Sequence, residues 1–146
     1  MSAISAGHSG DNSHSCAVSH DGTAYCWGSN SAGQLGDGTT DDPYSPGSPM
    51  PVLVQGLNDV TDIGAGGSHS CALLQDSTAY CWGNNSSGQL GNGTYVDSTL
   101  PVQVTGISGI TKISVGYLST CATLQDGTAH CWGNNHSAAL GGGDAL

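Results

Sequence analysis

The sequence lacks several residue types, and each absence narrows the range of folds that it can form. It contains no Phe, Glu or Arg, and Lys112 is its single Lys. Because only 5% of the residues are aromatic, Leu, Val, Ile, Ala and three Trp must supply the core. Two strong helix formers are missing while Gly fills 24 positions, so the composition favours short strands over long helices.

Positive charge is nearly absent as well. All eleven acidic residues are Asp, and the net charge is −10. Proteins hold the phosphate backbone of nucleic acids through Lys and Arg, so the chain is not expected to bind nucleic acid or anionic lipid. The acidic surface would keep a Gly-rich chain soluble, and it would favour cationic ligands, calcium among them.

Long apolar runs are also absent. No stretch approaches the length of a membrane span, and the start MSAISAGHSG has neither the basic region nor the apolar run of a signal peptide. We therefore expect no membrane partner. The first residues already belong to a repeated pattern, which indicates a chain that has lost a leader, or a naturally short or excised piece of a larger array.

What the sequence does contain is one unit in three copies. Three tryptophans recur at spacings of 55 and 50 residues, and a cysteine eleven residues before each of them recurs at the same spacings. A period near 50 residues is typical of a propeller or an array. We predict a single repeat domain over 1–146, with repeats at about 1–57, 58–107 and 108–146. The third is truncated because no PVxV segment follows its loop.

Each copy carries strand and turn signals. In SCALLQDSTAYCW two β-prone runs flank Asp-Ser, which is Asp-Gly in the other copies, and this predicts a β-hairpin. A loop rich in Gly, Asn and Ser follows, and PVQVTGI then alternates as a strand with Pro at its first residue. The predicted fold class is all-β, with about three propeller blades of four-stranded antiparallel sheets.

The pattern I-x-x-G…HSCAL…DG-x-x-YCWG-x-N…GQLG…P-x-x-V resembles the regulator of chromosome condensation repeat in its bacterial, cysteine-containing form. The resemblance implies a β-propeller, usually of seven blades. The founding eukaryotic member is an exchange factor for a nuclear GTPase and binds chromatin, but this chain lacks the basic surface for that role. A secreted bacterial relative inhibits β-lactamases through protein–protein contact, so the resemblance implies a general role in binding.

The six cysteines form three pairs with nine residues between the members of each pair: Cys16/Cys26, Cys71/Cys81 and Cys121/Cys131. A three-residue hairpin loop such as 20–22 would place the two cysteines directly opposite each other, close enough for a disulfide. A two-residue turn would make them diagonal. Three pairs without an odd cysteine favour intra-blade disulfides in an oxidising compartment, and buried free thiols are the alternative.

Repeated zinc sites are a further alternative. His14 and Cys16 share a strand face, as do His69 and Cys71, and the second cysteine of each hairpin would add a third ligand. The third copy has Ser119 in place of the histidine, and no CxxC occurs. A histidine at the start of such a strand is instead interpreted as a hydrogen-bonding partner of the next loop or blade.

The other recurring side chains are interpreted as scaffold. The tryptophans, Trp27, Trp82 and Trp132, are expected to pack between blades. In the GQLG turns, Gly permits positive φ and the Gln amide ties loop backbone groups. These turns comprise Gly33, Gln34 and Gly36 in the first copy and Gly88, Gln89 and Gly91 in the second. The third copy has Ala138 and Ala139 instead, which predicts a distorted loop.

Departures from the repeat are better candidates for chemistry, because the scaffold does not explain them. The first copy carries an insertion that includes His8, Asp11 and His14. These residues could form an acid–base pair or a metal site, and the alternative is a flexible loop near a chain end.

A second departure is the acidic loop DGTTDD in the first copy. It supplies Asp37, Asp41 and Asp42 as calcium candidates, although the loop lacks the full spacing of a calcium-binding motif. His130 and His136 replace Tyr and Ser of the other copies and are interpreted as surface variation.

Two functions from different classes follow. The first is a non-enzymatic propeller module that binds a protein or small ligand through its loop face and closes a ring by self-association, most simply as a homodimer. The second is a metal-assisted hydrolase of activated esters or phosphoesters, built from the first-copy insertion. The predicted disulfides and the resemblance together indicate a secreted or periplasmic bacterial protein.

Overall fold

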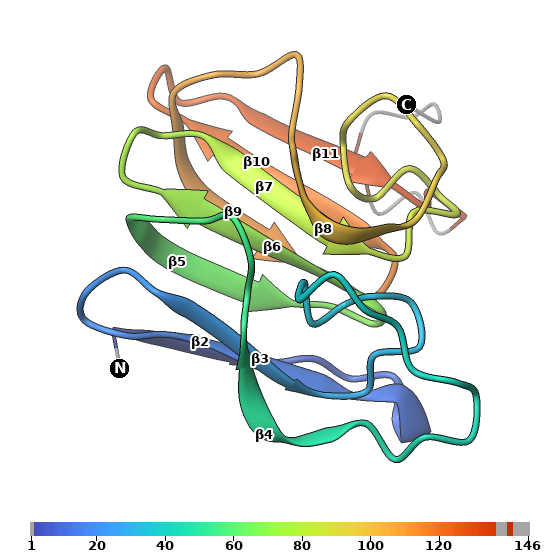
Figure 1. Ribbon diagram of the computed structural model, residues 1–146. Coiled ribbons are helices and arrows are strands. Elements are labelled where there is room, and N and C mark those ends of the chain that lie inside the picture. The colour runs from blue at the N-terminus through green and yellow to red at the C-terminus, as the bar shows by residue number, and fades with distance from the viewer. Residues whose placement is uncertain (1, 137–139, 142–146) are drawn as a thin grey trace.

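The computed structural model describes residues 2–136 and 140–141, and its strands form three antiparallel sheets that lie side by side (Figure 1). The strand orders are β1-β2-β3-β4, β5-β6-β7-β8 and β11-β10-β9. The first sheet consists of β1 (Ala3–Ala6), β2 (His14–Val18), β3 (Ala24–Gly28) and β4 (Ser48–Leu53). The second consists of β5 (Val60–Ala65), β6 (His69–Leu74), β7 (Ala79–Gly83) and β8 (Ser98–Gln103). The third consists of β9 (Ile110–Val115), β10 (Ser119–Leu124) and β11 (Ala129–Gly133), and a short 3₁₀ turn, η1 (Gly10–Asn12), lies between β1 and β2.

This architecture confirms the predicted all-β fold of blade-like antiparallel sheets. The third sheet has three described strands instead of four. The predicted repeat boundaries near residues 57 and 107 fall between β4 and β5 and between β8 and β9, and they stay predictions. In the described part of the chain, no helix has the length and apolarity needed to cross a membrane.

Each hairpin turns through three residues, and this register places the cysteines. In the first sheet Ser19 N donates to Thr23 O, which leaves residues 20–22 as the loop. Cys16 therefore pairs directly with Cys26, and the other two hairpins have the same register. All three predicted disulfides are confirmed: Cys16–Cys26, Cys71–Cys81 and Cys121–Cys131. The free-thiol and zinc alternatives are wrong, because every cysteine is oxidised.

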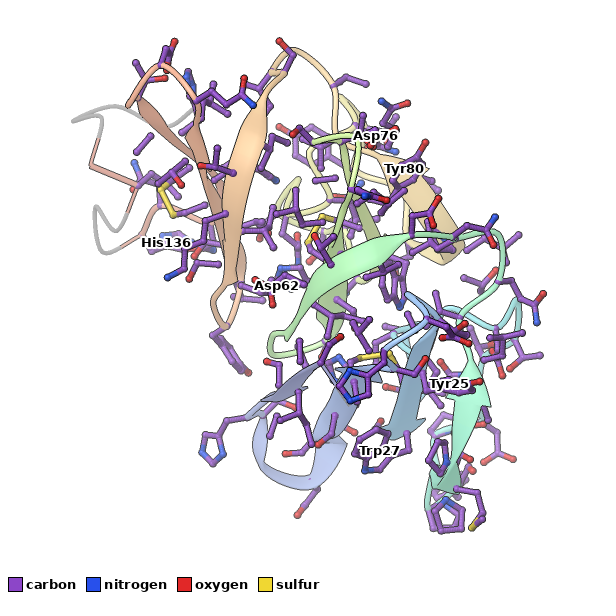
Figure 2. All side chains as sticks on the ribbon, turned by 90° about the vertical axis from the view of Figure 1, so that its left-hand side faces the viewer. Tyr25, Trp27, Asp62, Asp76, Tyr80 and His136 are labelled. Atoms are coloured by element: carbon purple, nitrogen blue, oxygen red, sulfur yellow. A yellow bond between two sulfur atoms is a disulfide. The ribbon has the colours of Figure 1, made fainter. Side chains whose placement is uncertain are left out.

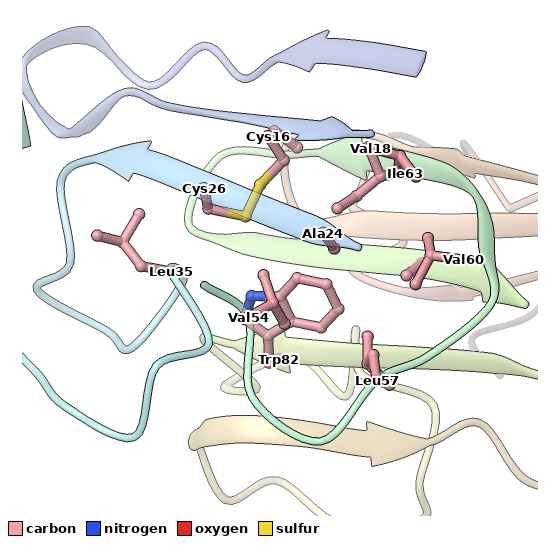
Figure 3. Packing of buried hydrophobic residues seen from close by; sticks show 12 residues of the cluster. Cys16, Val18, Ala24, Cys26, Leu35, Val54, Leu57, Val60, Ile63 and Trp82 are labelled. Carbon is pink, nitrogen blue, oxygen red and sulfur yellow. A yellow bond between two sulfur atoms is a disulfide. The ribbon is translucent and has the colours of Figure 1, made fainter. Parts of the chain in front are cut away.

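The core lies between the sheets. Trp82 of β7 is fully buried in a cluster with Leu35, Val54 and Leu57, which follow β3 and β4 of the first sheet (Figure 3). A matching cluster around Leu90 joins the second sheet to the third. Each sheet therefore depends on its neighbour for burial of its apolar residues, as expected for repeats that cannot form a core alone.

The sheets approach each other most closely at a column of glycines, one after the first strand of each sheet. A Cβ atom built on Gly7 would collide with the carbonyl oxygen of Gly66, and one built on Gly66 would collide with the carbonyl oxygen of Gly116. Any side chain at these two positions would force neighbouring backbones apart, because protein interiors have no spare volume for it.

Gly66→Ala is therefore expected to lower the free energy of unfolding by about 2–3 kcal/mol. Gly116→Ala is the matched control in the third sheet, where the new Cβ would meet only Ser119, with Oγ at 3.0 Å and the carbonyl oxygen at 3.4 Å. The control should cost less than about 1 kcal/mol. Urea denaturation followed by circular dichroism measures both changes. Equal losses in the two variants would contradict the proposed close approach of the sheets.

Candidate functional site

A chain of three hydrogen bonds crosses from the first sheet to the second. His14 Nε2 lies 2.7 Å from Ser70 Oγ. Ser70 Oγ donates to the main-chain oxygen of Gln34 over 2.8 Å, and Trp82 Nε1 donates to the same oxygen over 2.8 Å. All four residues are buried. We call this arrangement the latch.

The latch recurs between the second and third sheets with one substitution. His69 Nε2 lies 2.9 Å from Thr120 Oγ1, and this hydroxyl donates to the main-chain oxygen of Gln89 over 2.8 Å. Trp132 Nε1 donates to the same oxygen over 3.0 Å. Thr supplies the same hydroxyl as Ser, so the chemistry of the latch is unchanged.

The latch requires a proton on Nε2 of each histidine. A carbonyl oxygen cannot donate, so the proton of Ser70 Oγ points at Gln34 and His14 Nε2 must carry the proton that it donates to Ser70. Burial lowers the pKa of His14 to about 4, against the opposing effect of a backbone hydrogen bond to His69. Burial also lowers the pKa of His69 to about 4, with the nearby His14 as a second cause. Both rings are therefore neutral at pH 7.

The loop that presents each Gln carbonyl is held by buried amide side chains. Gln34 Oε1 accepts from Ala32 N over 2.8 Å, and Asn30 Oδ1 accepts from Leu35 N over 3.0 Å. The second copy repeats both bonds through Gln89 and Asn85. The glycines of both GQLG turns have positive φ. The loop is rigid as a result, and the latch acceptor is held at a fixed position.

The structure does not bring the three insertion residues together. His8 and Asp11 are exposed, whereas His14 is buried and bonded to the second sheet. No observation supports the hydrolase hypothesis, because the histidine nearest the core is committed to the latch.

The acidic loop uses two of its three carboxylates in turns. Asp37 Oδ1 accepts from Thr39 N over 3.0 Å and from Thr39 Oγ1 over 2.7 Å, and Asp42 Oδ1 accepts from Tyr44 N over 2.8 Å. Asp41 N donates to Asn30 O. Within residues 2–136 and 140–141, no group of three or more His, Cys, Asp or Glu side chains is placed to hold a metal ion. No site for calcium or zinc is formed there.

The remaining predicted positions lie apart from these groups. His130 and His136 are exposed on the third sheet and the loop after it. Ala138 and Ala139 lie outside the described residues.

The first sheet has half of a further latch on its outer side. Ser15 and Trp27 are paired across β2 and β3 in the same register as Ser70 and Trp82. None of the described residues forms a preceding sheet for them to bond, and Trp27 lies on the side of the first sheet that faces away from the other two (Figure 2).

The apolar row beside this half-latch is exposed at both ends, at Ile4 and Leu53, whereas Ala17 within it is buried. Ile4, Ala17, Tyr25 and Leu53 are cross-strand neighbours on the same side of the first sheet, which we call the open face. Ile4 is 70% exposed, whereas its counterparts Ile63 and Ile113 are 4% and 5% exposed under the preceding sheets. The open face therefore has the residues of a packing surface without the neighbour that covers it elsewhere in the fold.

Family models match this repeat pattern. The model of the regulator of chromosome condensation (RCC1) repeat matches residues 21–73 and 76–123, which is more than half of the chain, and a second model of the same repeat matches 2–34, 60–89 and 110–138. The chain belongs to the RCC1 repeat family.

Similar proteins carry RCC1-like sequence as part of longer chains. The RCC1-repeat chain is 43% identical to the probable E3 ubiquitin-protein ligase HERC6 of Homo sapiens over 82 residues, which is 55% of this chain and 8% of that protein. It is 34% identical to the ultraviolet-B receptor UVR8 of Arabidopsis thaliana over 84 residues, 58% of this chain and 18% of the receptor.

Solved structures share the fold. Yeast RCC1 (Prp20), in its crystal structure bound to Kap60, superimposes with a TM-score of 0.78 at 24% identity, covering 94% of this chain and 33% of that one. The RCC1-repeat chain thus spans about a third of this solved relative and less than a fifth of the two curated relatives.

The latch makes stability depend on pH. Because the folded pKa of His14 and His69 lies below the ordinary value of 6.5, the unfolded chain binds protons in the window between pH 6.5 and 4 that the folded chain does not. Stability is therefore full above pH 6.5 and falls as the pH drops towards 4. We expect each histidine to account for about 2–3 kcal/mol of this loss at pH 4.5.

Urea unfolding at pH 7 and pH 4.5 measures the effect. His69→Gln should reduce the difference between the two pH values by the share of one histidine, while the exposed His20→Gln should leave it unchanged. An identical pH dependence in the wild type and in His69→Gln would rule out this role for the latch.

Proposed function

We propose that the chain is a non-enzymatic interaction module, which binds a protein or small ligand through its loop face and self-associates through its open face. The observation that supports this proposal best is the exposure of Ile4 beside the half-latch of the first sheet. The equivalent isoleucines of the second and third sheets are both buried under a neighbouring sheet. Surfaces of this kind are covered by a partner in most proteins.

The loop face consists of residues 29–47 and 84–97, which connect β3 to β4 and β7 to β8 at the same end of the sheets (Figure 1). It exposes Tyr44 at 96%, Tyr95 at 73% and Val96 at 72%. Exposed tyrosines are enriched where proteins bind proteins. Yeast RCC1 was solved bound to Kap60, and Prp20p was described with its binding to Gsp1p and histones. With a net charge of −10, this chain favours a partner surface that is neutral or basic.

The cysteines support a compartment outside the cytosol. Three disulfides with no free cysteine fit an oxidising environment, so we place the protein outside the cytosol, in the extracellular space or a periplasm.

Self-association through the open face is testable by mass. Native mass spectrometry at micromolar concentration should find a homodimer, with twice the 14.5 kDa mass of one chain. Ile4→Asp places a charge at the centre of the buried contact and should convert the dimer to a monomer. Val96→Asp is the matched control, because Val96 is about as exposed but lies on the loop face. A wild-type monomer at these concentrations would overturn self-association.

The latch specifies how two copies would meet. Head-to-tail closure sets the outer side of the third sheet against the open face of the other copy and gives six blades, but Ser119 stands where His14 and His69 form the internal latches. Ser119→His restores the donor for Ser15 at both interfaces of the closed ring and should strengthen dimerisation about 30-fold, since each hydrogen bond contributes about 1 kcal/mol. The gain should disappear when Ser15→Ala is added. An unchanged dimer affinity in Ser119→His would contradict the head-to-tail arrangement.

A further inference from the structure

A cavity of about 370 Å³ lies beside the outer edge of β11. Its walls come from the loop 84–97, from the segment 104–107 after β8 and from the third sheet, and they include Gly88, Gly93, Tyr95, His130 and Trp132. Among the described residues, β11 pairs only with β10, so its other edge is free for hydrogen bonding. We call this cavity and edge the groove.

In the second sheet, the equivalent position at the edge of β7 is filled by the start of β8. There the loop of the first sheet packs directly on the strand, since a Cβ atom on Gly33 would lie 2.9 Å from Thr99 Cα. Gly38 N donates to Thr99 O over 3.1 Å, and a Cβ on Gly38 would touch Leu100 Cδ2 at 3.5 Å. Two glycines thus shape the first loop to receive an extended backbone.

No described strand packs against the corresponding glycines of the second loop. Gly88, the counterpart of Gly33, meets only the Tyr95 ring, and Gly93, the counterpart of Gly38, has nothing within 4 Å. Their φ values of +76° and +80° are close to the +82° and +86° of Gly33 and Gly38. The receiving conformation is therefore already formed, although no described residue occupies the groove.

The tryptophan beside the groove shows the same difference. Trp82, whose sheet includes β8, is completely buried, whereas Trp132 keeps part of its surface exposed and lines the groove. An extended segment at the free edge would therefore find an apolar wall as well as unpaired backbone groups.

We propose that the groove binds an extended peptide segment of the pattern Ser-x-x-Pro-Val-x-Val, as an added antiparallel strand on β11. This pattern is shared by residues 48–54 (SPMPVLV) and 98–104 (STLPVQV), which occupy the equivalent edges of the first two sheets. In β8, Ser98 lies opposite Gly83 and Val102 opposite Cys81. The bound segment takes the same register, with its Ser opposite Gly133 and its first Val opposite Cys131. Gly93 N–H donates to the carbonyl that corresponds to Thr99 O.

This inference rests on the proposed interaction role and names a ligand class for it. The groove and the open face are on different sheets, so the two can fail separately. A wild-type chain that is monomeric but still binds the peptide would retain the groove and overturn only self-association.

The test uses a labelled synthetic peptide of residues 97–106, DSTLPVQVTG, added to the full chain. Fluorescence anisotropy should show saturable binding, and the reversed sequence should bind at least tenfold more weakly. Gly93→Val should weaken binding at least tenfold by filling the groove. Gly56→Val is the matched control, because Gly56 also has a positive φ and open space around it but lies outside the groove.

Hydrogen exchange on the wild-type chain locates the bound peptide without any substitution. Saturating peptide should slow exchange of the main-chain amides of residues 129–133 at least tenfold. Absence of saturable binding, equal binding of the reversed peptide, or protection elsewhere with none at residues 129–133 would each overturn the proposal.

Discussion

At each interface between neighbouring sheets, one main-chain oxygen accepts two hydrogen bonds from the sheet that follows. In the first interface this is the oxygen of Gln34, with Ser70 and Trp82 as its donors. A buried carbonyl without partners is costly, so the two donors and the acceptor must stay together once water is excluded. The rigid loop, the buried histidine and the position of the tryptophan all follow from this requirement. The close approach of the glycine column is possible because the sheets cannot slide relative to one another.

The latch also gives the stack of sheets a direction. The histidine and the carbonyl belong to one sheet, and the hydroxyl and the indole belong to the next, so the two sides of a blade are not interchangeable. The open face ends the stack with donors, and the third sheet ends it with Ser119 in the histidine position. A further neighbour of the first sheet therefore completes the half-latch only if it presents a main-chain acceptor to Ser15 and Trp27. This restricts the set of partners far more than apolar area alone.

The fold could be predicted from the sequence to a large extent, and the site only in part. The period of the tryptophans predicts the blades, because strand geometry links spacing to position. The nine-residue spacing of the cysteines leaves two hairpin registers open, and the three-residue loop of the structure decides between them. The latch acceptor escaped prediction because a main-chain oxygen has no side-chain signature, and its donor alternates between Ser70 and Thr120. The insertion drew attention to His14 as a catalytic candidate, although the buried counterpart His69 in an uninterrupted copy already indicated a structural role. Groove residues such as Gly93 were not predicted from the sequence, because the same glycine pattern occurs in both loops. In the first loop a strand packs against these glycines, and in the second loop no described strand does.

The disulfides, finally, are confined to single hairpins, each closing a loop between residues ten positions apart. No covalent bond other than the main chain joins one blade to the next. A gene that gains or loses a whole blade therefore never leaves an orphan thiol, and oxidative folding faces the same local pairing problem whatever the blade number. Such a chain can change length by duplication while its redox chemistry stays constant, which helps to explain how one repeat can occur in proteins of very different size.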